Sequence, residues 1–204
     1  MLKVGITGGI GSGKSTVCNV LKNLGVPVFT SDDVAKKLLN SDDYLKNEIK
    51  KTFDSDMYTS TDRIDRERMA KLVFNNPDDL KRLNELVHPR VKAEFDNWCK
   101  KNEKKPYVVK EAAILFETGQ HKELDKMVTV FCPREERIRR LISRDTNATQ
   151  ESIEKRMIHQ FSDAERNALA DYIILNDGKE DLLPQVMELH ELLLNQYTKI
   201  KALF

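Results

Sequence analysis

Short apolar segments alternate along this chain with longer segments in which apolar residues recur at helical spacing. After the first short segment, Val17, Leu21 and Leu24 follow helical spacing, and Gly25 with Pro27 ends that helix. The pattern predicts five buried strands, near residues 2–7, 27–30, 106–109, 127–131 and 172–175. It also predicts a final amphipathic helix from about Glu180. Short apolar strands separated by helices favour a parallel, three-layer α/β sheet.

A long block between the second and third predicted strands is helical in pattern, with little strand character. Within it, Pro77 suits the first turn of a helix, and the pair His88-Pro89 is expected to interrupt that helix. We interpret the block, about residues 33–104, as an inserted substrate-binding subdomain. The remaining core of this single domain then covers about 1–32, 105–133 and 167–204.

Charge and cysteine content narrow the class of protein. The 204 residues carry a net charge of +1, so nothing indicates a nucleic-acid binder held by bulk charge. The three cysteines are far apart in apolar contexts, which favours buried thiols in a reducing cytosol. We find no signal-peptide pattern and no long apolar run, and we expect a cytoplasmic protein without a membrane partner.

The segment Gly8 to Ser15 fits G-x-x-x-x-G-K-[ST], the phosphate-binding P-loop. Its glycines allow successive N–H groups to point into one concavity, and the following helix adds the positive end of its dipole. Lys14 is placed to reach the β- and γ-phosphates of a nucleotide, and the Ser15 hydroxyl to hold Mg²⁺. The predicted nucleotide contacts are Gly9, Ile10, Gly11, Ser12, Gly13, Lys14, Ser15 and Thr16.

Arginine is concentrated in one part of the chain. Between Arg134 and Arg166 there are seven arginines and one lysine, against five arginines and twenty-one lysines elsewhere. Guanidinium groups bind phosphate through paired hydrogen bonds, which ammonium groups do not. Arg137, Arg140 and Arg144 share one face of a predicted helix, opposite Ile138, Leu141 and Ile142. We interpret residues 134–166 as an arginine-rich helical lid over the phosphates, although a solvated face paired with acidic neighbours remains an alternative.

P-loops serve kinases, GTPases and motor ATPases, so the motif alone does not name a reaction. The strings D-x-x-G and N-K-x-D, expected of a GTPase, are absent from this sequence. A small kinase acting on a small acceptor therefore fits best. A nucleotide-binding switch protein is the alternative from another class, and a nucleoside monophosphate or sugar alcohol is an alternative acceptor.

The sequence resembles the dephospho-CoA kinase family over nearly its whole length. The resemblance lies in the run Gly5 to Val17, in Ser31-Asp32-Asp33-Val34-Ala35-Lys36, in Phe74-Asn75-Asn76-Pro77, in Leu86-Val87-His88-Pro89, in Ile114-Leu115-Phe116-Glu117, in Arg140 to Asp145, in Arg156 to Gln160, and in Ala170 to Ile174 with Asn176. It implies ATP-dependent phosphorylation of the ribose 3′-hydroxyl of dephospho-CoA, giving coenzyme A and ADP. It also implies a P-loop core, a helical CoA subdomain and a lid. We expect ATP and dephospho-CoA as the partners of a monomer or weak homo-oligomer.

The resemblance assigns roles to particular residues. Asp32 would accept the proton of the ribose hydroxyl, with Lys14 and Arg140 as the other catalytic groups and Arg144 and Asn176 as further ATP contacts. His88 and Glu117 would contact the acceptor, and Ser15, Asp32 and Glu111 would bind Mg²⁺. Two departures from the family pattern bear on this: Thr30 stands where a first acid is often found, and Glu111 replaces an aspartate. On residue type alone, two alternatives stay open: Asp32 as the cap of the helix from Asp33, and His88 as part of a helix break.

Overall fold

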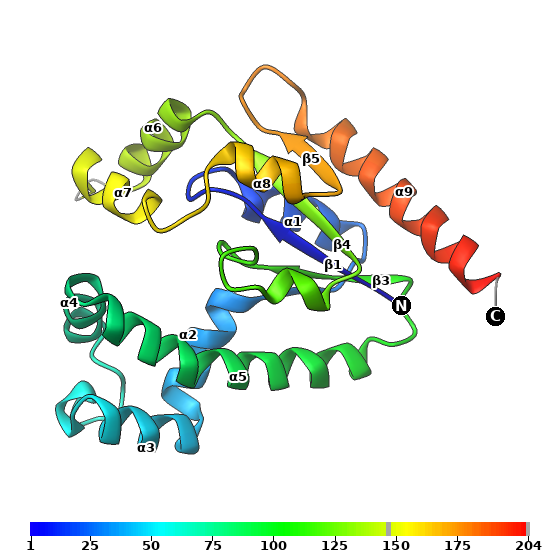
Figure 1. Ribbon diagram of the computed structural model, residues 1–204. Coiled ribbons are helices and arrows are strands. Elements are labelled where there is room, and N and C mark those ends of the chain that lie inside the picture. The colour runs from blue at the N-terminus through cyan, green and yellow to red at the C-terminus, as the bar shows by residue number, and fades with distance from the viewer. Residues whose placement is uncertain (146–147, 203–204) are drawn as a thin grey trace. The chain divides into compact units, whose positions relative to one another are not determined.

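The strands predicted from the apolar segments form one sheet. A computed structural model describes residues 1–145 and 148–202, and within them β1 (Leu2–Thr7), β2 (Val28–Thr30), β3 (Tyr107–Glu111), β4 (Lys126–Phe131) and β5 (Tyr172–Leu175) are arranged in the order β2-β3-β1-β4-β5 (Figure 1). The pairs β1–β3, β1–β4 and β4–β5 are parallel, with Val4 opposite Val109 and Lys126. The predicted five-stranded parallel sheet is therefore confirmed.

The chain divides into two compact units. One comprises residues 1–29 and 102–204 and contains most of the sheet; the other comprises residues 30–101 and is mostly helical. The first unit holds the helices α1 (Lys14–Asn23), α6 (Arg134–Arg144), α7 (Gln150–Met157), α8 (Asp163–Leu169) and α9 (Leu182–Lys201), and the 3-10 turn η2 (Gln120–Glu123). The second holds α2 (Ser31–Ser41), α3 (Asp43–Thr52), α4 (Arg66–Asn75) and α5 (Pro77–Lys101), and the 3-10 turn η1 (Ser55–Met57).

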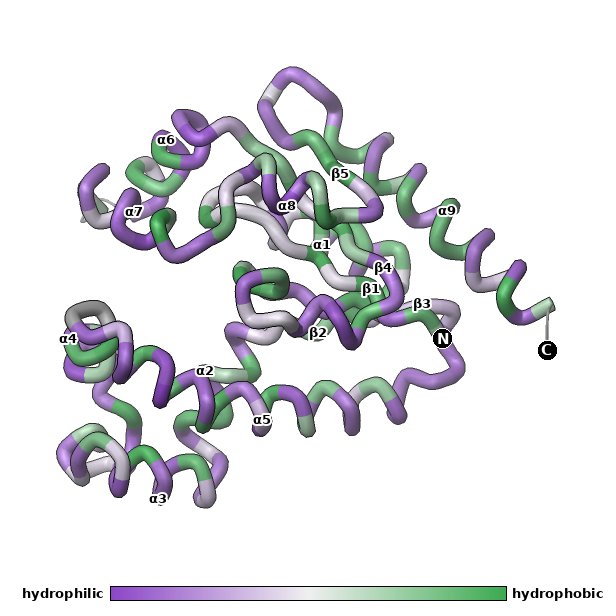
Figure 2. Tube along the Cα trace, in the orientation of Figure 1, coloured by the Kyte–Doolittle hydropathy of each residue, from purple (hydrophilic) through white to green (hydrophobic). Residues whose placement is uncertain are grey.

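The two faces of the sheet are covered by different elements. Alternate residues of β1 point to one face, where α1 and α9 complete a core whose buried members include Val4, Ile6, Leu21, Val128, Val186 and Leu193. Gly5 points to the opposite face, where a Cβ would lie 2.5 Å from the Met127 sulfur. That face carries a second cluster, formed by Ala112, Leu115, Phe116 and Met127 with Phe161 and Ala170 packed against it. β4 is buried from Met127 to Val130, whereas β5, at the edge of the sheet, buries Ile174 and exposes Ile173 and Leu175. Both strands are largely hydrophobic in Figure 2.

The long helix α5 corrects one expectation. The pair His88-Pro89 does not interrupt it, because α5 continues through Pro89 to Lys101. A proline inside a helix costs about 3 kcal/mol. Four side chains at spacings of four residues, namely Val87, Val91, Phe95 and Cys99, are buried along α5. Each buried apolar side chain contributes roughly 1.5–3 kcal/mol, so their packing outweighs the proline.

Helices α6 and α7 pack through a small apolar cluster of Ile138, Leu141 and Ile153, with Ile10 of the P-loop against it. Ile142 is 41% exposed. Of the three arginines predicted to share a face of α6, Arg137 is buried, Arg140 is half-buried and Arg144 is exposed. Residues 146–147 of the predicted lid lie outside the described residues.

All three cysteines are buried free thiols, as predicted. Burial, followed by the negative charge of Glu111, raises the pKa of Cys18 to about 12. Within the part of the chain that the structure describes, no helix has the length and apolar character needed to span a bilayer.

Candidate active site

The P-loop connects β1 to α1, and its bends depend on glycine. Gly8, Gly11 and Gly13 have φ values of 151°, 80° and 96°, a region that other residues rarely adopt. Gly13 is the N-cap of α1 in a left-handed conformation, and the Thr16 and Val17 N–H groups bond to its carbonyl at 3.0 and 3.2 Å. The chain therefore turns sharply at the point where the helix begins, and the first N–H groups of α1 lack intrahelical partners.

Neighbouring groups lie so close to the loop that side chains would not fit. A Cβ on Gly9 would overlap the Arg137 guanidinium, and a Cβ on Gly13 would overlap the Asn176 amide nitrogen. A Cβ on Gly11 would lie 3.0 Å from the Arg137 carbonyl oxygen. The glycines thus serve two purposes here: they permit the turn, and they admit these polar groups to the loop.

Lys14 lies over the loop that precedes it. Its Nζ donates to the Gly8 carbonyl at 3.0 Å and to the Gly9 carbonyl at 3.4 Å. Ser15 and Thr16 follow in the first turn of α1, where both are exposed. A primary ammonium group, two hydroxyl groups and the positive end of a helix dipole are thus gathered at one place, and each of them favours an anion.

Asn176 and Arg140 fasten the loop to the end of β5. The Asn176 side-chain amide donates to the Ser12 carbonyl at 2.8 Å, and its backbone N–H donates to the Phe131 carbonyl at 2.8 Å. Arg140 donates from its terminal nitrogen to the Asn176 carbonyl at 3.1 Å and from Nε to Glu136 at 2.8 Å. The structure therefore brings one predicted catalytic residue, Arg140, and one predicted ATP contact, Asn176, into the same hydrogen-bonded network as the P-loop.

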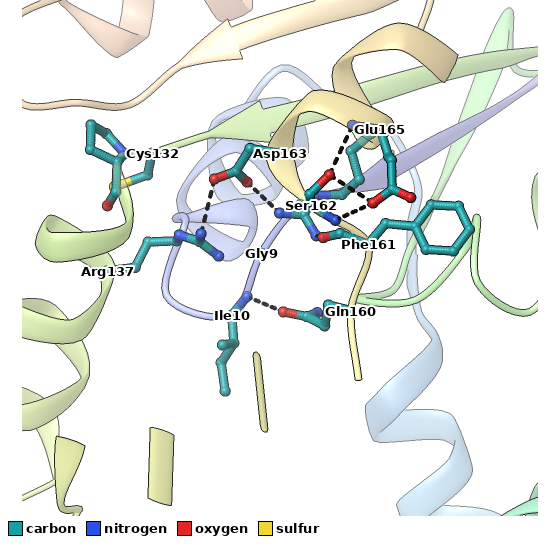
Figure 3. A network of polar contacts seen from close by, with 12 residues as sticks. Gly9, Ile10, Cys132, Arg137, Gln160, Phe161, Ser162, Asp163 and Glu165 are labelled. Atoms are coloured by element: carbon teal, nitrogen blue, oxygen red, sulfur yellow. Dashed lines mark hydrogen bonds and ion pairs between the residues drawn. The ribbon is translucent and has the colours of Figure 1, made fainter. Parts of the chain in front are cut away.

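A pair of buried arginines shares one carboxylate beside Gly9 (Figure 3). Arg137 donates to Asp163 at 3.0 Å, and Arg166 bonds to the other oxygen of Asp163 and to the Phe161 carbonyl. The Arg137 and Arg166 side chains are 7% and 2% exposed, and Arg137 Nε is buried without a hydrogen-bond partner. Burial lowers the pKa of Arg137; the negative charge of Asp163 opposes this effect, and the positive charge of Arg166 adds to it. Two cations against one shared anion leave positive charge next to the loop.

Gln160 makes a contact that the sequence did not single out as functional. Its side-chain oxygen accepts from the Ile10 N–H at 2.9 Å (Figure 3). Its side-chain nitrogen donates to the Ala113 carbonyl at 3.1 Å. It therefore joins the P-loop to the segment after β3. A residue 150 positions away in sequence leaves no local signal of such a contact, beyond its place in the family resemblance.

Oxygen ligands suited to Mg²⁺ occur beside the P-loop. Glu111 ends β3 opposite Ile6 of β1, and its charge acts on Cys18, one turn along α1 from Ser15. A buried carboxylate and an exposed hydroxyl near the first turn of α1 are hard oxygen donors of the kind that Mg²⁺ binds together with phosphates and water. These two residues fit the ion.

The remaining predicted site residues lie at the edge of this network or in the other unit. Glu117 accepts from the Phe161 N–H at 2.8 Å, while its second oxygen is buried without a hydrogen-bond partner. Arg144 is exposed at the end of α6, and His88 lies in the middle of α5. Asp32 lies within the first turn of α2, which has Thr30 as its N-cap. The helix begins earlier than expected, so the alternative of Asp32 as a cap is wrong.

Comparisons with known proteins agree with this geometry. The family model described as dephospho-CoA kinase matches residues 2–181. A dephospho-CoA kinase from Bacteroides fragilis is 38% identical over 188 residues, covering 92% of this chain and 91% of the relative. The crystal structure of TT1252 from Thermus thermophilus has 32% identity and a TM-score of 0.79, covering 92% of this chain and 95% of that one. A dephospho-CoA kinase from Campylobacter jejuni, at 24% identity and a TM-score of 0.68 over 93% of this chain and 95% of that one, shares the fold.

These findings confirm the resemblance drawn from the motifs, and they give no support to a switch protein or to a kinase with another acceptor. The chain is a kinase with the P-loop α/β fold, and it belongs to the dephospho-CoA kinase family.

Proposed function

We propose that this protein transfers the γ-phosphoryl group of ATP to the ribose 3′-hydroxyl of dephospho-CoA, giving coenzyme A and ADP. Membership of the family supports the reaction, and the observation that carries it is the P-loop with Lys14 held over it. The test is a panel of acceptors with Mg-ATP: dephospho-CoA, nucleoside monophosphates and shikimate. Transfer to dephospho-CoA alone is expected, and transfer only to a nucleoside monophosphate would contradict the proposal.

Phosphoryl transfer requires positioning and neutralisation of charge more than covalent chemistry. When ATP enters, Lys14 would exchange the Gly8 and Gly9 carbonyls for the β- and γ-phosphate oxygens. The amides of the first turn of α1 would bind the same phosphates. The hydrogen bonds of Gln160 and Asn176 support this role, because they fix the loop before the nucleotide arrives.

Mg²⁺ is the proposed cofactor, with Ser15 and Glu111 holding it from the first unit and Asp32 as a further carboxylate ligand. The ion would neutralise charge on the β- and γ-phosphate oxygens when bound. Glu111, whose side chain is longer than that of aspartate, would reach the ion through a water molecule.

Asp32 is the proposed general base. It lies two residues beyond the end of β2, in a turn where a carboxylate interacts favourably with the positive end of the helix dipole. Accepting the proton of the 3′-hydroxyl would also orient the attacking oxygen. Asp32→Asn should leave ATP binding intact and lower kcat by roughly 10²–10⁴-fold. The matched control is Asp33→Asn, which removes an exposed carboxylate paired with Lys36 at 3.2 Å, and it should keep near-normal turnover.

Positive charge at the transferred group would come from the arginines near the loop. Arg140 remains our first candidate, because one of its terminal nitrogens would lie 3.9 Å from a Cβ on Gly13. Arg137, beside Gly9, would add fixed charge from within the structure. Arg144 and Asn176 are proposed to contact the nucleotide, the latter near the adenine.

The acceptor side of the site is proposed from the family resemblance. His88 and Glu117 would contact dephospho-CoA, and the unit of residues 30–101 would supply most of its binding surface. We further propose that α6 and α7 move as a lid. The protein would act in the cytoplasm as a monomer or weak homo-oligomer, and its net charge of +1 agrees with the absence of a nucleic-acid partner.

A further inference from the structure

The helical unit contains a basic pocket of about 480 Å³. Nine residues line it, of which five are basic and one is acidic: Lys36, Lys37, Lys46, Arg63 and Arg66, with Asp62. The volume is within the range of small-molecule sites. A pocket with this imbalance of charge is suited to a ligand that carries more than one negative charge.

The pocket is built by a short hairpin that docks against α2. Tyr58 and Ile64 form an antiparallel bridge, and the Tyr58 hydroxyl donates to the Leu39 carbonyl at 2.9 Å. The Ile64 N–H donates to the Asn40 side-chain oxygen at 3.0 Å. Hydrogen bonds at both ends of the hairpin hold its tip, with Asp62 and Arg63, at the pocket.

At the tip, Asp62 adopts a positive φ of 56°, which is uncommon for a residue with a side chain. Its carboxylate bonds to Lys46 at 2.6 Å and to Lys50 at 3.1 Å. The Lys46 side chain is only 11% exposed. The acid of the pocket is therefore already engaged in ordering the lysine behind it, while Lys37, Arg63 and Arg66 are exposed. Exposed guanidinium groups beside a lysine match phosphate oxygens well.

Part of the pocket is lined by α2, the same helix that carries the proposed base Asp32. Asp32, Lys36 and Asn40 are four residues apart, so they share one face of α2. Four residues of α-helix rise about 6 Å. In a ribose with phosphates at its 5′ position, only three carbons separate the 3′-hydroxyl oxygen from the 5′-oxygen that carries the phosphates. The distance from the 3′-hydroxyl to those phosphates is therefore comparable to this rise. If Asp32 faces the 3′-hydroxyl, the 5′-linked phosphates would lie toward Lys36.

We propose that this basic pocket binds the diphosphate group of the acceptor. The inference rests on the acceptor proposed above, and it adds the residues that distinguish a ribose with a 5′-diphosphate from one without. The pocket thus acts as a specificity site, whereas the P-loop holds the donor phosphates.

The test is the double variant Lys37→Gln with Arg63→Gln, compared with Lys71→Gln, an exposed lysine of α4 that does not line the pocket. Losing one charge-assisted hydrogen bond corresponds to roughly a tenfold or larger loss of affinity. The double variant should raise KM for dephospho-CoA about tenfold or more, with KM for ATP and the urea unfolding midpoint unchanged. Adenosine, which lacks the diphosphate, should be phosphorylated equally slowly by the double variant and the unaltered protein.

A direct binding measurement separates this inference from the proposed reaction. Dephospho-CoA is titrated into the protein in a calorimeter, with the P-loop saturated by a non-hydrolysable ATP analogue. This measures the affinity for dephospho-CoA whether or not phosphoryl transfer occurs. Weaker binding by the double variant, with Lys71→Gln unaffected, would support the pocket even if no 3′-phosphorylation were found. Equal binding by all three proteins, or an equal loss toward ATP and acceptor, would overturn it.

Discussion

Replacing Asp163 by asparagine is expected to destabilise the protein more than any ordinary surface change. Asp163 is the shared carboxylate between Arg137 and Arg166, whose side chains are 7% and 2% exposed. Arginine stays protonated in proteins, so neither guanidinium escapes the change by losing its proton. The substitution would leave two buried cations without their anion.

Removing one partner of a buried ion pair costs about 3–5 kcal/mol. Two features of this site place the expected loss of stability at the lower end of this range. The Asp163 side chain is 26% exposed, so water reaches it, and an asparagine oxygen still accepts one hydrogen bond. We therefore expect a loss of about 3 kcal/mol, a large part of the 5–15 kcal/mol that stabilises a typical domain.

The assay is urea unfolding followed by circular dichroism. With a slope of about 2 kcal/mol per molar urea, the midpoint should fall by about 1.5 M. The matched control is Glu151→Gln, which breaks an exposed pair with Lys155 at 2.8 Å and should change stability by less than about 1 kcal/mol. Adding Arg137→Gln to Asp163→Asn should recover part of the loss, because one uncompensated charge is removed. A midpoint for Asp163→Asn as high as that of Glu151→Gln would refute the reasoning.

Three further predictions concern other parts of the chain. Pro89→Ala should raise the urea midpoint, with a gain of about 1–3 kcal/mol from the restored helix hydrogen bond; a loss would show that α5 needs the proline. Burial raises the pKa of Asp42, but hydrogen bonds from the Leu45 N–H and the Arg90 guanidinium outweigh it and hold that pKa below its usual range. The resulting stability is present in full above about pH 4 and is lost as pH falls through the lowered pKa. Asp42→Asn should therefore lower the melting temperature at pH 7, by a difference that shrinks as the pH is lowered below about 4; a constant difference would contradict this. Cys18, with its raised pKa, should react with iodoacetamide at pH 8 at least roughly a hundredfold more slowly in the native than in the unfolded protein, and equal rates would contradict its burial.

Local patterns in the sequence predicted the scaffold of the site. The strands, the P-loop and the start of α1 depend on apolar runs and on glycines at fixed spacing, which act over a few residues. Bounds differed by one or two residues, as at the start of α2, and that small shift decided that Asp32 is not a cap. Helical spacing also placed Arg137 and Arg140 on one face of α6 correctly.

Helical spacing did not predict which side chains are buried or which residues contact the P-loop, because both depend on tertiary contacts. Arg137 is buried and Arg140 is not, because Asp163 arrives from a helix 26 positions away. The contacts of Ser12 with Asn176 and of Ile10 with Gln160 join residues 164 and 150 positions apart. At Pro89, the local preference for a break was overridden by an apolar stripe that extends to either side of it.

The most direct test of the account is the position of the new phosphate in the product. Purified protein would be incubated with Mg-ATP and dephospho-CoA, and the product compared with authentic coenzyme A by mass spectrometry and phosphorus NMR. The account predicts one added phosphoryl group on the ribose 3′-oxygen, with ADP released in equal amount. Phosphate on another oxygen, or ATP hydrolysis without transfer to dephospho-CoA, would contradict it.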